Sequence, residues 1–247
     1  MDRLVYVAMS GAKETLRAQT TNSYNLANIA TIGFKADVSA FQSRQVTGAG
    51  LPSRAYATDS SAGADLGDGT IEQTGRNLDV AVQGPGWIAV QSPQGNEAYT
   101  RAGDLHVDVN GLLTTAQGYP VLSDSGPIAV PPYASIGVGN DGSVSIVPLG
   151  QTAATIAVVG RIKLVNPAGD SLERGDGGLF RLSTGADAPS DSGVHLATGA
   201  LESSNVNMAS AMVNMISLAR NYDMQLKTMK AAEDNDSSAT KLLQTSS

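Results

Sequence analysis

Apolar side chains follow a helical period at the start of the chain. Residues 4–30 contain no Pro, and their apolar positions recur in steps of three and four residues. The centre of this segment is polar, and Asn22, Asn25 and Asn28 follow one another at three-residue spacing. Gly33 stands where a glycine commonly ends a helix. The pattern predicts a helix whose apolar stripe is too narrow for it to stand alone.

The period changes twice in the middle of the chain. Residues 35–74 show no sustained period and are rich in Gly, Ser, Ala and Asp, which predicts an extended connection. Residues 75–202 consist of short alternating runs separated by turn signals. Among these signals are Asn110-Gly111 and Asp141-Gly142, which supply the positive φ angles that tight hairpins need. This part of the chain is expected to form an antiparallel β domain.

A heptad pattern marks the last segment, residues 203–247, with Ser204 or Asn205 as the expected N-cap. The members of the seam alternate steps of three and four residues: Met212, Met215, Ala219, Tyr222, Leu226 and Met229. Because the N-terminal helix is too polar to complete a two-helix core, we expect this seam to pack between chains. A buried row of Asn in that helix is likewise costly unless neighbouring chains supply hydrogen-bond partners.

These patterns together predict a mainly β fold. An antiparallel β domain is inserted between N- and C-terminal helices that pair as a coiled coil on assembly. The expected divisions are an N-terminal helix, an extended connection, the β domain and a C-terminal helix, at residues 1–34, 35–74, 75–202 and 203–247.

The composition excludes several classes of function. The chain has 16 Lys plus Arg against 23 Asp plus Glu, so it lacks the positive surplus of a nucleic-acid binder. It has no Cys, which excludes disulfides and thiolate metal sites. No stretch approaches the roughly 20 apolar residues of a membrane span, and the N-terminus meets charges too soon for a cleaved signal peptide. We therefore expect neither nucleic acid nor membrane insertion.

One group of residues has the chemistry of a metal site. Asp104, His106 and Asp108 alternate along one strand and share a face, so they could hold a divalent ion. The simpler interpretation is that they form the solvated face of that strand. The stretch 137–142 matches G-x-G-x-x-G, but a strand pattern follows it where a phosphate site needs a helix. We expect no enzyme, cofactor or metal.

Three separated blocks carry a resemblance to a known family. They read LANIATIGFKAD from Leu26, LDVAVQGPGWIAV from Leu78 with YTRAGDLHVDVNGLLTTAQGYPVL from Tyr99, and GALESSNVNMASAMVNMISLARNYDMQLK from Gly199. Their order and their spread over nearly the whole chain resemble the bacterial flagellar axial family of rod and hook proteins. In the first block, the matching positions are Asn28, Thr31, Gly33, Phe34 and Lys35.

The resemblance implies a structural subunit of the proximal flagellar rod that transmits torque. It implies terminal helices packed as an inner tube and a β domain facing outward. The implied partners are further copies, other rod proteins and the flagellar type III export apparatus, and the implied place is the periplasmic rod, reached without a cleaved signal. The alternatives are a distal rod protein of the same family and a secreted oligomeric β-domain binding module.

The expected assembly interface combines the asparagine row, the first block and the heptad seam. Its residues are Asn22, Asn25, Asn28, Thr31, Gly33, Phe34, Lys35, Asn205, Met212, Met215, Ala219, Tyr222, Leu226 and Met229.

Overall fold

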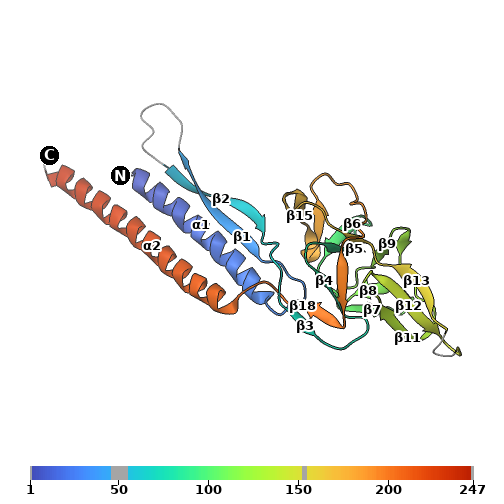
Figure 1. Cartoon of the computed structure of the whole chain (residues 1–247). Helices are drawn as coiled ribbons and strands as arrows, with labels where there is room; N and C mark the ends of the chain where they lie inside the picture. Colours follow the sequence, from blue (N-terminus) through green and yellow to red (C-terminus); the bar gives the residue numbers. More distant parts are fainter. Residues whose placement is uncertain (1, 46–54, 152–154, 246–247) are drawn as a thin grey trace. The chain divides into compact units, whose positions relative to one another are not determined.

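The computed structural model describes residues 2–45, 55–151 and 155–245, which form two compact units (Figure 1). The helical unit comprises the chain up to residue 27, residues 37–63 and the chain from residue 207 onward. The β unit comprises residues 28–36 and 64–206. The chain therefore passes between the units four times. Residues 28–34, which the sequence pattern grouped with the N-terminal helix, belong to the β unit.

Two long helices dominate the helical unit, α1 (Asp2–Ala27) and α2 (Met208–Thr245). They lie side by side and antiparallel (Figure 1). The Asn22 Nδ2 of α1 donates to the Ala211 oxygen near the start of α2, at 2.8 Å. Gly11, earlier in α1, lies against the side chain of Gln225, later in α2. Every helix in the described ranges is too short or too polar to cross a membrane.

Small side chains explain how a polar helix such as α1 packs on α2. The positions buried in α1 include Ala8, Ala12 and Ala18, and those buried in α2 include Ala211 and Ala232. Small residues at an interface let two helix backbones approach closely, so the contact needs no broad stripe of large side chains. The expectation that α1 is too polar to complete a two-helix core is therefore wrong, and the helices pair within one chain.

The ends of the helices differ from the predicted ones. The N-cap of α2 is Asn207, whose Oδ1 accepts from the Ser210 N–H at 3.0 Å. Asn205, one of the two predicted caps, instead binds other segments of the β unit. α1 ends at Ala27, and Gly33 follows a short turn with a φ of 66°.

The segment predicted as an extended connection contains paired strands. They are β1 (Asp37–Gln45) and β2 (Ala55–Ala64), which follow α1 in the sequence and form a two-stranded sheet. Most residues of both strands are small or polar, and the few large apolar ones, such as Val38 and Phe41, do not alternate in a way that a sequence pattern could reveal. Residues 46–54 of this segment lie outside the described residues.

The β unit contains the remaining strands. A five-stranded sheet has the order β14 (Leu164–Val165), β5 (Trp87–Gln91), β6 (Glu97–Thr100), β16 (Phe180–Leu182), β15 (Leu172–Arg174). A three-stranded sheet has the order β11 (Tyr133–Val138), β12 (Ser143–Pro148), β13 (Ala157–Arg161). Four two-stranded sheets complete it: β3 (Ile71–Gln73) with β18 (Ala200–Glu202), β4 (Val80–Gln83) with β17 (His195–Thr198), β7 (Leu105–Val107) with β8 (Leu113–Thr115), and β9 (Leu122–Ser123) with β10 (Gly126–Pro127). Two short 3₁₀ helices span Gly169–Ser171 and Asp176–Gly178.

All strand pairs in the described part of the β unit are antiparallel, as the turn signals predict. Gly111 and Gly142 have φ angles of 81° and 84° and close the predicted hairpins. The stretch with the G-x-G-x-x-G spacing is the second of these hairpin turns and opens no helix. β5 is covered on both faces, since Ile88 packs in the larger core and Trp87 in a second, aromatic core.

Candidate functional site

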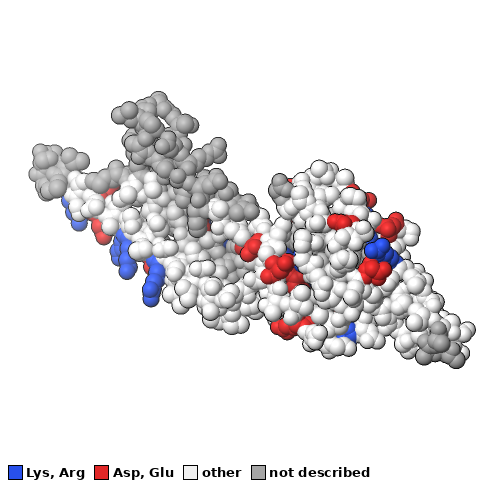
Figure 2. Space-filling model, in the orientation of Figure 1, with Lys and Arg blue, Asp and Glu red and all other residues white. Residues whose placement is uncertain are grey.

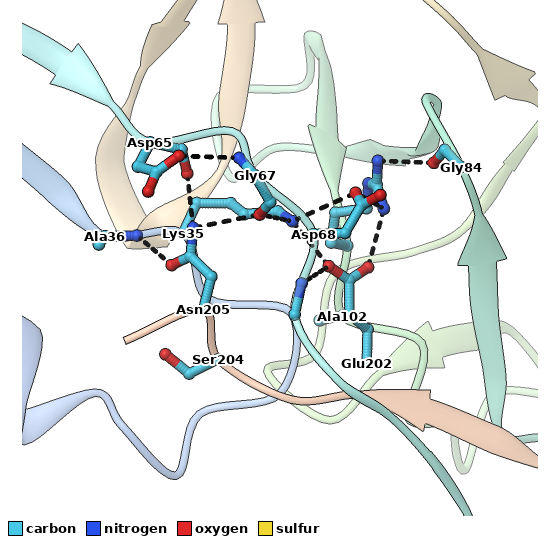
Figure 3. Close-up of polar contacts among 12 residues, drawn as sticks. Lys35, Ala36, Asp65, Gly67, Asp68, Gly84, Ala102, Glu202, Ser204 and Asn205 are labelled. Carbon is cyan, nitrogen blue, oxygen red and sulfur yellow. Dashed lines mark hydrogen bonds and ion pairs between the residues drawn. The ribbon is translucent and has the colours of Figure 1, made fainter. Parts of the chain in front are cut away.

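Three deeply buried charged residues of the β unit meet in one place (Figure 3). We call Lys35, Asp68, Arg101 and Glu202 the charge cluster. The Lys35 Nζ lies 2.6 Å from the Glu202 Oε1, and the Arg101 Nη1 lies 2.8 Å from the Glu202 Oε2. Asp68, which is exposed, adds a second carboxylate 3.3 Å from the Arg101 Nη1. Glu202 is thus bound by two cations from distant parts of the sequence.

Backbone groups complete the charge cluster. The Lys35 Nζ donates to the Gly67 oxygen at 2.8 Å, and the Gly69 N–H donates to the Glu202 Oε1 at 2.9 Å. Burial of the Glu202 carboxyl acts to raise its pKa, but the hydrogen bonds from Lys35 and Gly69 and the charge of Arg101 outweigh it. The pKa of Glu202 is therefore lowered from its ordinary value. The carboxylate stays ionised although it is buried.

The segments around the charge cluster are held to one another by backbone contacts. The Gly33 N–H donates to the Glu202 oxygen at 2.8 Å. A Cβ on Gly33 would lie 2.2 Å from the Arg101 carbonyl carbon, and the φ of Gly33 is positive, so the position requires glycine. Asn205 accepts from the Ala36 N–H at 2.8 Å through its Oδ1.

Asn205 also donates through its Nδ2, to the Asp65 oxygen at 2.8 Å and to the Gly67 oxygen at 3.1 Å. One amide side chain therefore connects residues 28–36, residues 64–69 and the chain just before α2. All four passages of the chain between the units begin or end in these segments. The β unit thus holds those three segments together by hydrogen bonds and buried ion pairs.

The predicted asparagine row finds its partners inside the chain. Besides the Asn22 contact with α2, the Asn25 Nδ2 donates to the Asp37 oxygen at 2.9 Å and its Oδ1 accepts from the Asp37 N–H at 2.8 Å. The Asn28 Oδ1 accepts from the Thr31 hydroxyl at 3.1 Å. The expectation that neighbouring chains must supply these hydrogen bonds is therefore wrong. Own-chain partners remove the cost of burying the amides.

The other residues predicted from the first block lie in or beside the charge cluster. Lys35 is a member of it, and Gly33 contacts two of its members. Phe34 is buried under the Arg174 guanidinium, 4.9 Å from the ring centre. These side chains have an internal role in the chain, and their part in an assembly interface stays a prediction.

The predicted heptad seam is split between two faces of α2. Met215, Tyr222 and Met229 are half-buried, whereas Met212, Ala219 and Leu226 are exposed. The inner positions follow the same spacing in a different register: Ala211, Met215, Leu218, Tyr222, Gln225, Met229 and Ala232. The outer face of α2, as we use the term, consists of its exposed large apolar side chains: Met208, Met212, Val213, Ile216, Met224 and Leu226. Leu226 is 41% exposed and Ile216 is 55% exposed, so the chain itself leaves an apolar helix face open.

The strand with the metal-like spacing folds only in part as the simpler interpretation predicts, because Asp104 is half-buried and not on a solvated face. His106 is exposed beside Thr114, and Leu105 takes the buried face. The Asp108 carboxylate accepts from the Asn110 and Leu112 N–H groups and so holds the following turn. Among the described residues, no three His, Asp or Glu side chains gather in a way that could hold a metal ion.

Asp104→Asn is expected to raise the free energy of unfolding by about 1 kcal/mol at neutral pH. Burial raises the pKa of Asp104, and the charge of Asp79 adds to this, while Arg76 and His106 act against it. Its Oδ1 is also buried without a partner among the described residues. The ionised carboxyl therefore costs stability in the folded chain, and a neutral amide removes that cost.

Urea unfolding of both proteins between pH 3 and pH 8 measures the effect of Asp104→Asn. The gain is expected to shrink as the pH falls through the raised pKa, because the wild-type carboxyl then becomes neutral as well. A variant less stable than the wild type at pH 7 would show that the Asp104 carboxylate is needed.

Sequence reasoning missed Arg101, Asp68 and the role of Glu202. The signal was present in part: Arg101 stands in the short run AYTRA, between two predicted strands, and a charge that is buried there needs a partner. Which partner it takes depends on contacts between segments about 100 residues apart, and no local pattern reports these.

Comparisons with known proteins agree with the blocks noted in the sequence. Residues 81–146 match the family described as "Flagellar hook protein FlgE/F/G D1 domain", and residues 197–242 match "Flagellar basal body rod FlgEFG protein C-terminal". The chain is 44% identical to the flagellar basal-body rod protein FlgF of Escherichia coli K12, over 98% of this chain and 99% of that protein. It is 41% identical to FlgF of Salmonella typhimurium, with the same coverage. It is 31% identical to the rod protein FlgG of Bacillus subtilis, over 95% of this chain and 96% of that protein.

Proposed function

The chain belongs to the flagellar basal-body rod protein family, and we propose that it builds the proximal part of the rod and transmits torque through it. The identity to the two FlgF proteins is higher than that to FlgG, and it extends over nearly the whole length. This difference favours a proximal rod subunit over a distal one.

The open outer face of α2 is the observation that carries this proposal. Met212, Ile216 and Leu226 expose between 41% and 55% of their surface, although such side chains are usually buried. Contiguous exposed apolar side chains mark surfaces that other proteins cover. Since α1 already covers the inner face of α2, the outer face is available for the helices of neighbouring subunits.

The charge cluster supports a mechanical role. Torque passes from one subunit to the next only if the segments that leave the β unit do not slip against one another. The Lys35–Glu202 pair and the Asn205 amide hold three of these segments with directional contacts. Buried ion pairs fix geometry more than they add stability, which suits a part that must hold its shape.

The partners follow from this role. We infer that the chain assembles with further copies of itself and with the other rod proteins, and that its role is structural rather than enzymatic. We further infer that the flagellar type III export apparatus carries it to the periplasmic rod, since the rod proteins that it resembles are parts of the flagellum.

Deletion of the gene tests the proposal. We expect non-motile cells that regain motility when the full chain is supplied, and we expect antibodies to detect the chain in basal bodies isolated from complemented cells. A secreted β-domain binding module, the alternative from another class, predicts motile deletion cells and basal bodies without the chain.

A further inference from the structure

The β11–β13 sheet lies in a part of the sequence that is almost free of charge. Between Asp124 and Arg161 there is one charged residue, Asp141, although charged residues make up 16% of the chain. Asp141 lies in the turn between β11 and β12 and accepts from the Arg161 Nε through its backbone oxygen, at 2.7 Å. Both of these charges therefore lie at one end of the sheet.

The other end of the same sheet exposes apolar side chains. Leu149 and Val158 are each 70% exposed, and Ile156 is 68% exposed. Figure 2 shows the surface over this end of the sheet, next to the grey residues, as white. We call these three residues the uncharged patch. These three side chains are not part of the core, since the core side of the sheet is formed by other residues, Ile136 and Ile146 among them.

The outer face of the sheet beside the uncharged patch is small and uncharged. Ser145 pairs with Val158 on one side and with Gly137 on the other, and Ser135 pairs with Val147. Directly paired residues project from the same face of a sheet. Small side chains there would let a second surface approach closely.

β13 is also an edge strand, because it is the last strand in the order of this sheet and β12 is its partner there. Natural edge strands are commonly protected from pairing by a charged residue or a Pro in the strand. β13 reads AVVGR, so its single charge, Arg161, comes at its last residue and at the far end from Ile156. The edge next to the uncharged patch lacks this protection.

We propose that the uncharged patch and the edge of β13 form a contact with the β unit of another copy of this chain. The charge of the chain favours a second copy. With a net charge of −7, two copies repel each other over most of their surfaces, and a contact between them is best made where neither carries charge. This inference rests on the proposed function, which brings neighbouring copies together in the rod.

Photo-crosslinking in basal bodies tests this contact. Val158 is replaced by the photoreactive residue p-benzoylphenylalanine, and Val109 is replaced in the same way as the matched control. Val109 is a fully exposed valine of the β unit outside the charge-free stretch. Illumination is expected to give a species of twice the 25.3 kDa chain from position 158 but not from position 109.

A second variant tests the chemistry of the contact. Val158→Lys, in a chain that carries the crosslinker at Leu149, is expected to lower the yield of the double-mass species by about tenfold, because a charge would be buried without a partner. Val109→Lys in the same background is expected to leave the yield unchanged. Both positions are exposed, so thermal unfolding of the two variants should match that of the wild type.

The outcomes separate this inference from the proposed function. A crosslink from position 158 to a different protein, or equal yields from positions 158 and 109, would overturn the inference and leave the rod assignment in place. If antibodies find no chain in the basal bodies before illumination, both the proposed function and the inference that rests on it are wrong.

Discussion

Glu202→Gln is expected to lower the free energy of unfolding by about 3–5 kcal/mol, because it removes the one buried carboxylate that Lys35 and Arg101 share in the charge cluster. The Lys35 side chain is fully buried and the Arg101 side chain is 3% exposed, so water cannot replace the lost negative charge. Asp68 compensates only in part, since it lies 3.3 Å from the Arg101 Nη1 but 4.0 Å from the Lys35 Nζ, and it is itself exposed. A loss of this size is a large part of the stability of a typical domain.

Fluorescence of Trp87 during urea unfolding measures the effect of Glu202→Gln. Trp87 is the single tryptophan of the chain, and the Arg101 guanidinium lies 5.3 Å from its ring centre, so its emission reports on the unfolding of the β unit. Glu173→Gln is the matched control, because Glu173 is an exposed glutamate of β15 in the same unit. A Glu202→Gln variant as stable as this control would show that the charge cluster is not needed for the fold.

The same measurement against pH tests the ionisation of Glu202. Its pKa is lowered in the folded chain, so the carboxylate contributes stability above its ordinary pKa, near 4.5. That contribution is lost as the pH falls through the folded pKa, because the unfolded chain binds the proton first. The wild type should therefore lose more stability than Glu202→Gln as the solution is acidified below about pH 4.5. Parallel curves for the two proteins would contradict a lowered pKa.

Local signals predicted the β unit well. Asn110-Gly111 and Asp141-Gly142 close hairpins because glycine reaches the positive φ that these turns need without steric cost, and this holds whatever surrounds the turn. The prediction failed for β1 and β2, which consist mostly of small and polar residues. Their pairing is not visible in the period of apolar side chains.

The charge cluster was beyond prediction for a different reason. Lys35, Arg101 and Glu202 come from three segments that meet only when the chain is folded. The sequence shows that each of them needs a partner if buried, but it does not show which of the 39 charged residues is that partner. The family signature marked Lys35 and Glu202 without indicating that they bind each other.

The heptad pattern predicted the spacing of the α2 residues that contact α1, but not the face of α2 on which they lie. A search for large apolar side chains selects Met212 and Leu226, whereas the contact with α1 uses Ala211 and Gln225, next to each of them. Side-chain size was the wrong criterion, because these two helices pack closely through alanines and leave bulky apolar side chains exposed. Met212 and Leu226, which the prediction placed on the wrong face of α2, are informative about assembly, because these apolar side chains are exposed in the isolated chain.

Leu226→Asp is therefore expected to leave the isolated chain folded and to abolish motility. The side chain is 41% exposed, so thermal unfolding followed by circular dichroism should change little, with a cost of at most about 1 kcal/mol. In an assembled rod the same position would place a carboxylate between packed helices. That loses the roughly 1.5–3 kcal/mol of a buried Leu and adds a desolvation cost of several kcal/mol. The loss repeats at every subunit, so we expect an exported protein that fails to form a rod.

Asn221→Asp is the matched control for Leu226→Asp, because it adds the same charge at an exposed position of α2 that is not apolar. Cells with this variant should swim, which would separate the loss of an apolar contact from the mere addition of negative charge. If Leu226→Asp unfolds the helices of the isolated chain, Leu226 supports the pairing of α1 with α2 and the outer face begins elsewhere. If the variant is stable and its cells swim as the control does, neighbouring subunits do not cover Leu226. The interface between rod subunits must then use the inner register of α2, which would require α1 to separate from α2 during assembly.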